Sequence, residues 1–137
     1  MVSRGRSPIV TTARLALGIT FVVMALNYFF RILLNVHLLP VPVTDQGKQF
    51  AQSLQTIGFI WPFMKTVNLF AGSLLVVNRA PAFALALLLP STVMIVWFHV
   101  KLDPLPLPLL ITGLIVACEL VLLTAYWPRF APLLRSE

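Results

Sequence analysis

The sequence LALGITFVVMALNYFF, residues 15–30, lies between Arg14 and Arg31 and contains no charged side chain. As an α-helix it would be about 24 Å long, slightly less than the roughly 30 Å hydrocarbon core of a bilayer. The aliphatic stems of the two arginines can reach outward to the lipid headgroups and close the gap. No small-x-small cleavage site follows the run, as it would in a secretory signal peptide. We therefore predict that residues 10–34 cross a membrane as one helix.

The composition of the whole chain favours the same interpretation. Of its 137 residues, 59% are hydrophobic and 10% are charged, whereas soluble domains carry about 25% charged residues. The net charge of +6 comes from basic residues that interrupt apolar runs, while nucleic-acid-binding proteins gather such residues on one face. Cys118 is the single cysteine, which excludes a disulfide framework or a C-x-x-C redox motif within the chain. We predict the lipid bilayer as a partner and no nucleic acid.

Three further apolar runs predict three more spans, at about residues 61–77, 81–100 and 109–126. The link between the second and third spans is so short that they should form an antiparallel hairpin. Pro90 lies at the centre of the third span, so we expect a kink there with the freed backbone carbonyl facing protein rather than lipid. In residues 101–108, prolines at every second position disfavour helix for their predecessors and predict a turn.

The segment between the first two spans has a different pattern. In residues 47–60, Phe50, Leu54 and Ile57 recur at helical spacing and are opposed by polar side chains. This pattern is typical of an amphipathic helix that lies at the membrane surface. The predicted fold is therefore all-α: an antiparallel integral membrane four-helix bundle in residues 9–129, with this surface helix and with tails at 1–8 and 130–137.

The basic residues predict the orientation, because short cytoplasmic loops carry an excess of Lys and Arg. If the N-terminus is cytoplasmic, six basic residues fall on that side and four fall at or near the outer face. The inner six are Arg4, Arg6, Arg14, Arg79, Arg129 and Arg135, and the outer four are Arg31, Lys48, Lys65 and Lys101. We predict that both termini are cytoplasmic.

Glu119 is the clearest candidate for a functional residue, because an ionisable group inside a span is costly. At helical spacing it shares a face with Thr112 and Tyr126, which should face the bundle. One interpretation is structural: Glu119 pairs with Arg14, or is a protonated acid hydrogen-bonded to a neighbour. The other is functional: it handles protons or contacts a quinone. The sequence leaves both open.

A second candidate site lies in the outer half of the bundle. The predicted topology brings five polar residues towards that end: Asn27, Arg31, Lys65, His99 and Asp103. Such a cationic cluster would suit an anion, a lipid headgroup or a quinone head, although separate interfacial side chains without a shared pocket would give the same pattern. Because His37 and His99 lie in different segments, we predict no metal. Four small residues, Gly18, Gly72, Ser73 and Gly113, are interpreted as helix-packing positions.

Several stretches resemble the DoxX/DoxX-like family of small four-span bacterial membrane proteins, and together they cover nearly the whole chain. They are Ala13-Arg14-Leu15-Ala16-Leu17-Gly18 with Phe21 and Asn27, Gly72-Ser73-Leu74-Leu75, Asn78-Arg79-Ala80-Pro81, Leu89-Pro90, and Ile95-Val96-Trp97-Phe98-His99-Val100-Lys101-Leu102-Asp103-Pro104. The family usually carries an acidic residue one turn before the segment that begins at Gly72, and this chain has Asn68 there. That role is then either missing or performed by Glu119.

The resemblance implies a redox-linked membrane setting. Some relatives are subunits of a thiosulfate:quinone oxidoreductase, and others associate with membrane redox or oxidative-stress assemblies. We therefore expect a non-catalytic accessory subunit or scaffold whose partners are other membrane subunits or a redox enzyme. A quinone-contacting oxidoreductase subunit is the alternative, with quinone as the one cofactor considered. A small transporter or lipid-binding protein is a third hypothesis, which needs Asn27, Asn68 and Glu119 to face the bundle interior.

Overall fold

The structure is a computed structural model that describes residues 7–36 and 43–135. The helices are α1 (Pro8–Leu34), α2 (Asp45–Ile57), α3 (Ile60–Val76), α4 (Pro81–Lys101), α5 (Pro106–Ala125), α6 (Trp127–Phe130) and the 3₁₀ helix η2 (Ala131–Leu134). The described residues contain no strand, so the predicted all-α class is confirmed. Arg4, Arg6 and His37 lie outside the described residues.

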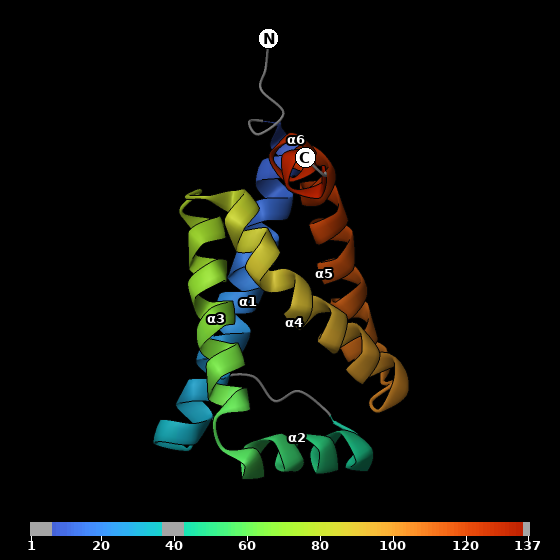
Figure 1. Ribbon diagram of the computed structural model, residues 1–137. Coiled ribbons are helices and arrows are strands. Elements are labelled where there is room, and N and C mark those ends of the chain that lie inside the picture. Colours follow the sequence, from blue (N-terminus) through green and yellow to red (C-terminus); the bar gives the residue numbers. More distant parts are fainter. Residues whose placement is uncertain (1–6, 37–42, 136–137) are drawn as a thin grey trace.

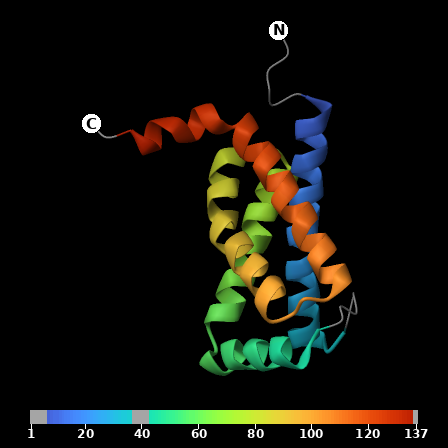
Figure 2. The same cartoon turned by 90° about the vertical axis from the view of Figure 1, so that its right-hand side faces the viewer.

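The four long helices α1, α3, α4 and α5 pack around a common interior (Figure 1). α1 contacts α3 and α5, and α4 contacts the same two helices, so each long helix has two neighbours. Neighbouring helices run in opposite directions, which places the start of α1 and the short helix α6 at the same end of the molecule (Figure 2). α2 lies across the opposite end, and its axis is bent by 97° from that of α3.

Three of these helices, α1, α4 and α5, are long and apolar enough to cross a membrane. A fourth candidate exists if α2 and α3 are counted together as one bent span. α3 alone has 17 residues, equivalent to about 26 Å of helix. Large apolar side chains on the outside of the long helices are exposed, for example Phe83, Trp97, Leu110 and Leu114. These features are compatible with a multi-pass membrane protein.

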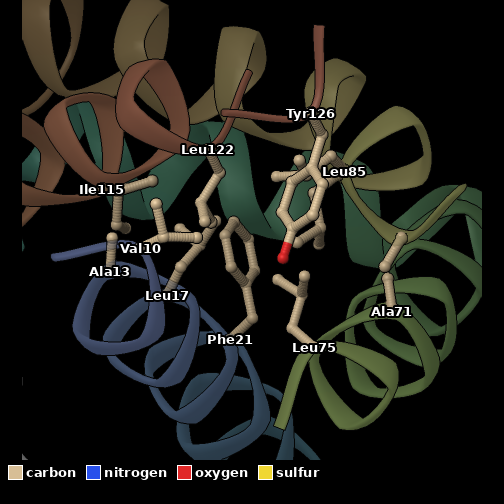
Figure 3. Packing of buried hydrophobic residues seen from close by; sticks show 12 residues of the cluster. Val10, Ala13, Leu17, Phe21, Ala71, Leu75, Leu85, Ile115, Leu122 and Tyr126 are labelled. Atoms are coloured by element: carbon tan, nitrogen blue, oxygen red, sulfur yellow. The ribbon is translucent and has the colours of Figure 1, made fainter. Parts of the chain in front are cut away.

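The interior of the packed helices is apolar. Figure 3 shows Leu17, Phe21, Leu75, Leu85 and Leu122 meeting there from all four long helices. Each of these side chains is at most 1% exposed. The side chain of Tyr126, at the end of α5, points its hydroxyl towards this cluster (Figure 3). Burial of this size stabilises the packing by about 1.5–3 kcal/mol for each large side chain if the reference state is water.

The turn between α4 and α5 is shorter than predicted. We expected a turn over residues 101–108, but α5 begins at Pro106, and Pro108 is also helical. The first four backbone N–H groups of a helix have no intrahelical partner. Prolines in this turn therefore lose no hydrogen bond, and their fixed φ suits the helix. The C-terminal segment also differs from a plain tail, because η2 occupies Ala131–Leu134.

α4 continues through Pro90 without a break in the helix. A proline inside a helix leaves the carbonyl four residues earlier without its usual donor, which here is that of Ala86. The side chains of Pro90 and Ala86 are both exposed. The altered turn therefore lies on the outer face of α4, and the prediction that it faces protein is wrong. The buried positions in this part of α4 are Leu88, Ser91 and Thr92.

Candidate functional site

The described residues include seven buried polar or charged side chains: Arg14, Asn68, Ser91, Thr92, Asp103, Thr112 and Glu119. Such groups are expensive to bury unless they find partners. Four of the eight residues that the sequence proposed as a site are among them. A polar group whose hydrogen bonds are all made within its own chain supports the fold and is not free to hold a ligand.

Glu119 lies on the inner face of α5 and is 3% exposed. The buried positions of this helix are Thr112, Ile115, Glu119 and Leu122, so the predicted stripe does face the interior. Thr112 is satisfied by its own helix, since its hydroxyl donates to the carbonyl of Pro108 at 2.8 Å. By contrast, neither carboxyl oxygen of Glu119 has a hydrogen-bond partner in the part of the chain that the structure describes. The Thr92 hydroxyl of α4 interacts with this carboxyl electrostatically but lacks hydrogen-bond geometry.

Arg14 does not pair with Glu119. Its guanidinium donates from Nη1 to the carbonyl of Leu75 and, at 3.2 Å, to the carbonyl of Val76. These are carbonyls of the last turn of α3, which carry the negative end of the helix dipole. The Leu75 carbonyl also accepts from the backbone N–H of Asn78 at 3.2 Å. A buried cation at this position is therefore stabilised by the backbone of α3. Arg14 joins α1 to α3, and its side chain is buried, so the prediction that it reaches outward to the lipid headgroups is wrong.

Asn68 and Ser91 connect α3 to α4. The Ser91 hydroxyl donates to Oδ1 of Asn68 at 2.7 Å, and both side chains are buried. Ser91 and Thr92 are consecutive residues that follow Pro90, yet the first interacts with α3 and the second with Glu119 of α5. A polar layer, defined here as Asn68, Ser91, Thr92 and Glu119, therefore crosses the interior. Its α3–α4 half is hydrogen-bonded and its α4–α5 half is not.

The five residues of the predicted outer cluster do not form one site. On the α1–α3 side, the ammonium of Lys65 lies 5.5 Å from the centre of the Trp61 ring. That ring contacts Tyr28 of α1, with 6.1 Å between ring centres. Arg31 is exposed and Asn27 is half-buried, both on α1. In the described residues no ion pair or hydrogen bond joins Arg31 or Lys65 to His99 or Asp103.

His99 and Asp103 instead belong to a second group at the end of α4. Asp103 is completely buried, and its Oδ1 accepts a hydrogen bond from the backbone N–H of Thr44 at 2.7 Å. The Thr44 hydroxyl donates to the carbonyl of Leu102 at 2.5 Å. His99 Nδ1 lies 3.3 Å from Asp103 Oδ2. These contacts fix the start of α2 to the end of α4.

Thr44 was not predicted as part of a site, although its role at the start of a helix can be recognised in the sequence. Thr44 is the N-cap of α2, and its hydroxyl accepts a hydrogen bond from the N–H of Gly47. A threonine directly before an amphipathic helical pattern is a recognisable helix start. Gly47 then allows close packing on α4, because a Cβ at that position would lie 3.2 Å from the ring of Phe98. Phe50 completes the contact, with 5.6 Å between its ring centre and that of Phe98.

A groove of about 510 Å³ lies beside this contact, between α2 and the outer face of α4. Its lining includes Phe50, Pro90, Met94, Trp97, Phe98 and Lys101. None of these residues was proposed as a site from the sequence, because each looks like an ordinary apolar or interfacial residue. α2 contributes Phe50 to the lining, and the contacts of Asp103 and Thr44 hold the start of α2 at this end of α4.

Comparison with known protein families, curated protein sequences and solved structures found no match to this chain. In residues 7–36 and 43–135, no three His, Cys, Asp or Glu residues are grouped so that they could hold a metal ion. The described residues offer one buried carboxyl without a hydrogen-bond partner, a threonine beside it, and an apolar groove with a lysine at one end. The carboxyl could exchange a proton, and the groove could hold an amphiphile.

Proposed function

We propose that this chain crosses the bacterial cytoplasmic membrane four times, through α1, α3, α4 and α5, with both termini cytoplasmic. In this arrangement α2 lies on the outer surface with its polar side towards water. Three helices that are long and apolar enough to span support the proposal, together with a fourth that packs antiparallel between two of them. Tags at the two termini should both be accessible only from the cytoplasmic side. Tags on opposite sides would contradict it.

Within that membrane setting, we propose a non-catalytic accessory subunit of a redox or oxidative-stress assembly, as the resemblance to DoxX-like proteins suggests. One observation carries this proposal: the buried polar groups mainly hold the helices of this chain together. Arg14 donates to the end of α3, Asn68 accepts from Ser91, and Asp103 accepts from Thr44. Side chains engaged in this way support a scaffold, because they leave few groups free for chemistry.

A pull-down from membranes in mild detergent tests the accessory role. A membrane-bound redox enzyme or its subunits should be recovered with the tagged chain, and a clean isolation of the chain alone would count against the proposal. The Gly113→Leu variant sharpens the test, since no described residue lies within 4 Å of a Cβ added there. A bulky side chain on this outer face of α5 should weaken a partner that packs there without unfolding the chain. Ala86→Leu, on the exposed face of α4, is the matched control.

The second candidate function is a quinone-linked oxidoreductase subunit, and Glu119 is the observation that favours it. A carboxyl that is 3% exposed and has no hydrogen-bond partner is costly in a membrane and is a default sign of function. In this role Glu119 would exchange protons while His99 contacts the quinone. Glu119→Gln and His99→Ala should then abolish quinone-dependent turnover in vesicles. Turnover at the parent rate in both variants would exclude this function.

A further inference from the structure

The groove beside α2 and α4 runs along the outer face of α4, with an apolar end near the middle of that helix and a charged end at its last residue. Pro90 lies at the first end and Lys101, the last residue of α4, at the second. Between them the walls are apolar side chains, among which Trp97 is 60% exposed. Among the described residues, Lys101 is the one charged residue that lines the groove. The groove therefore suits an amphiphile: its apolar lining can contact a hydrocarbon chain, and Lys101 can contact a negatively charged head.

The length of the groove matches half of a bilayer. Pro90 and Lys101 are eleven positions apart on one helix, which corresponds to about 17 Å. Half of a roughly 30 Å hydrocarbon core is about 15 Å. With α4 spanning the membrane, the groove runs from the middle of the bilayer to the surface on which α2 lies. It can therefore accommodate the acyl chain of one leaflet along its full length.

The part of the groove beside α2 is preformed, because Phe50, the α2 residue in its lining, is held in place. Phe50 of α2 packs on Phe98 of α4, and Gly47 lets the two helices approach closely. The Thr44 N–H holds the carboxylate of Asp103, which is fully buried. That carboxylate is thus engaged with Thr44 and with His99 and points away from solvent. Lys101, two residues earlier, is exposed and has no acidic partner among the described residues.

We propose that this groove binds one acyl chain of an anionic phospholipid, whose phosphate is held by Lys101. The proposal rests on the four-span placement of the chain but not on its role as an accessory subunit. The positive charge at the mouth selects an anionic headgroup over a zwitterionic one, because one lysine near an anionic surface contributes about 1 kcal/mol. That corresponds to a preference of about fivefold.

Tryptophan fluorescence tests the proposal directly, since Trp97 lines the groove. In a Trp61→Phe/Trp127→Phe background, Trp97 is the remaining tryptophan. The variant is reconstituted in lipid nanodiscs with brominated phosphatidylglycerol or brominated phosphatidylcholine, whose bromines quench tryptophan on contact. Quenching of Trp97 should saturate at about a fivefold lower fraction of the anionic lipid. A second background that keeps only Trp127, at the opposite end of the molecule, reports contact with bulk lipid and should show a smaller preference.

Two substitutions identify the charge responsible. Lys101→Gln should remove the preference, whereas Lys48→Gln, an exposed lysine on α2 that does not line the groove, should leave it. Equal quenching by the two lipids, or equal effects of the two substitutions, would overturn the lipid site. Displacement of brominated phosphatidylglycerol by an equimolar neutral quinone would assign the groove to quinone and also overturn it. If neither lipid quenches Trp97, the membrane placement on which the proposal rests is refuted.

Discussion

A methyl group added to Gly18 of α1 would lie 2.9 Å from the carbonyl oxygen of Gly72 on α3, and one added to Gly72 would lie equally close to the carbonyl oxygen of Gly18. The two glycines thus allow the two backbones to approach at one point. This close approach explains why the contact between α1 and α3 is the most extensive in the molecule. In a membrane, such contacts replace the hydrophobic effect as a source of helix association.

We expect Gly18→Ala and Gly72→Ala each to destabilise the protein by about 1–3 kcal/mol, the usual cost of overpacking. Alanine favours helix over glycine by about 1 kcal/mol, which reduces but does not reverse the loss. The double variant should cost less than the sum, because the first substitution already separates the helices. Unfolding in detergent measures these changes. Gly113→Ala is the control, and it should be neutral or slightly stabilising because its Cβ would meet nothing.

Replacing Arg14 should be costly whether or not Glu119 is present. Arg14→Met leaves the carbonyls of Leu75 and Val76 without their side-chain donor, at a cost of about 1–3 kcal/mol. Lysine at this position should restore only part of the loss, since it lacks the planar fork of arginine. Glu119→Gln breaks no hydrogen bond of the described structure, so it should change stability little.

A double-mutant cycle between Arg14→Met and Glu119→Gln separates the two interpretations of Glu119 left open by the sequence. With Arg14 bound to α3, the two effects should add to within about 0.5 kcal/mol. A coupling of more than about 1 kcal/mol would show that the two residues form an ion pair in the membrane. Both values come from the same unfolding measurement.

The hydrogen bond between Ser91 and Asn68 should contribute modestly. Ser91→Ala is expected to cost about 0.6 kcal/mol, the average for interhelical hydrogen bonds in membranes. Asn68→Leu should cost more than this, because it also enlarges a buried side chain against α4. Asn68→Asp keeps the oxygen that accepts the bond and should be better tolerated than leucine. If Asn68→Leu proved as stable as the parent, the polar contact would have no structural role.

Asp103 should control the attachment of α2. Asp103→Ala removes the acceptor of the Thr44 N–H, so amide hydrogen exchange in residues 45–57 should speed up by about tenfold, equivalent to about 1.4 kcal/mol. Asp103→Asn keeps an acceptor oxygen and should have a smaller effect. Mass spectrometry of the exchanged peptides reads out the change. Ser53→Ala, an exposed position on the same helix, should leave the exchange as it is.

Hydrophobic runs and prolines predicted the helices well, because each depends on local sequence. The surface helix before Gly58 is an example: Gly58 adopts a φ of +93°, a conformation suited to glycine, and α2 ends there. The contacts of the site were less predictable. Arg14 binds backbone carbonyls 61 and 62 residues away, and backbone acceptors leave no trace in the residue types of their partners.

The outer cluster shows a different limit of sequence reasoning. The topology does place Lys65 and His99 towards the same end of the molecule, as expected. However, Figure 1 shows the C-terminal half of α4 diverging from α3, with α2 lying beneath both. Depth along a helix can be counted from the sequence, but the angle between two helices depends on the side chains packed between them. One expected pocket therefore became two separate groups of residues.

Ser91 and Thr92 give α4 a fixed rotational setting. Adjacent residues on a helix point about 100° apart, and here one direction meets Asn68 on α3 while the other meets Glu119 on α5. A turn of α4 about its own axis would separate both pairs at once. The two adjacent residues Ser91 and Thr92 therefore relate the rotation of α4 to the positions of α3 and α5.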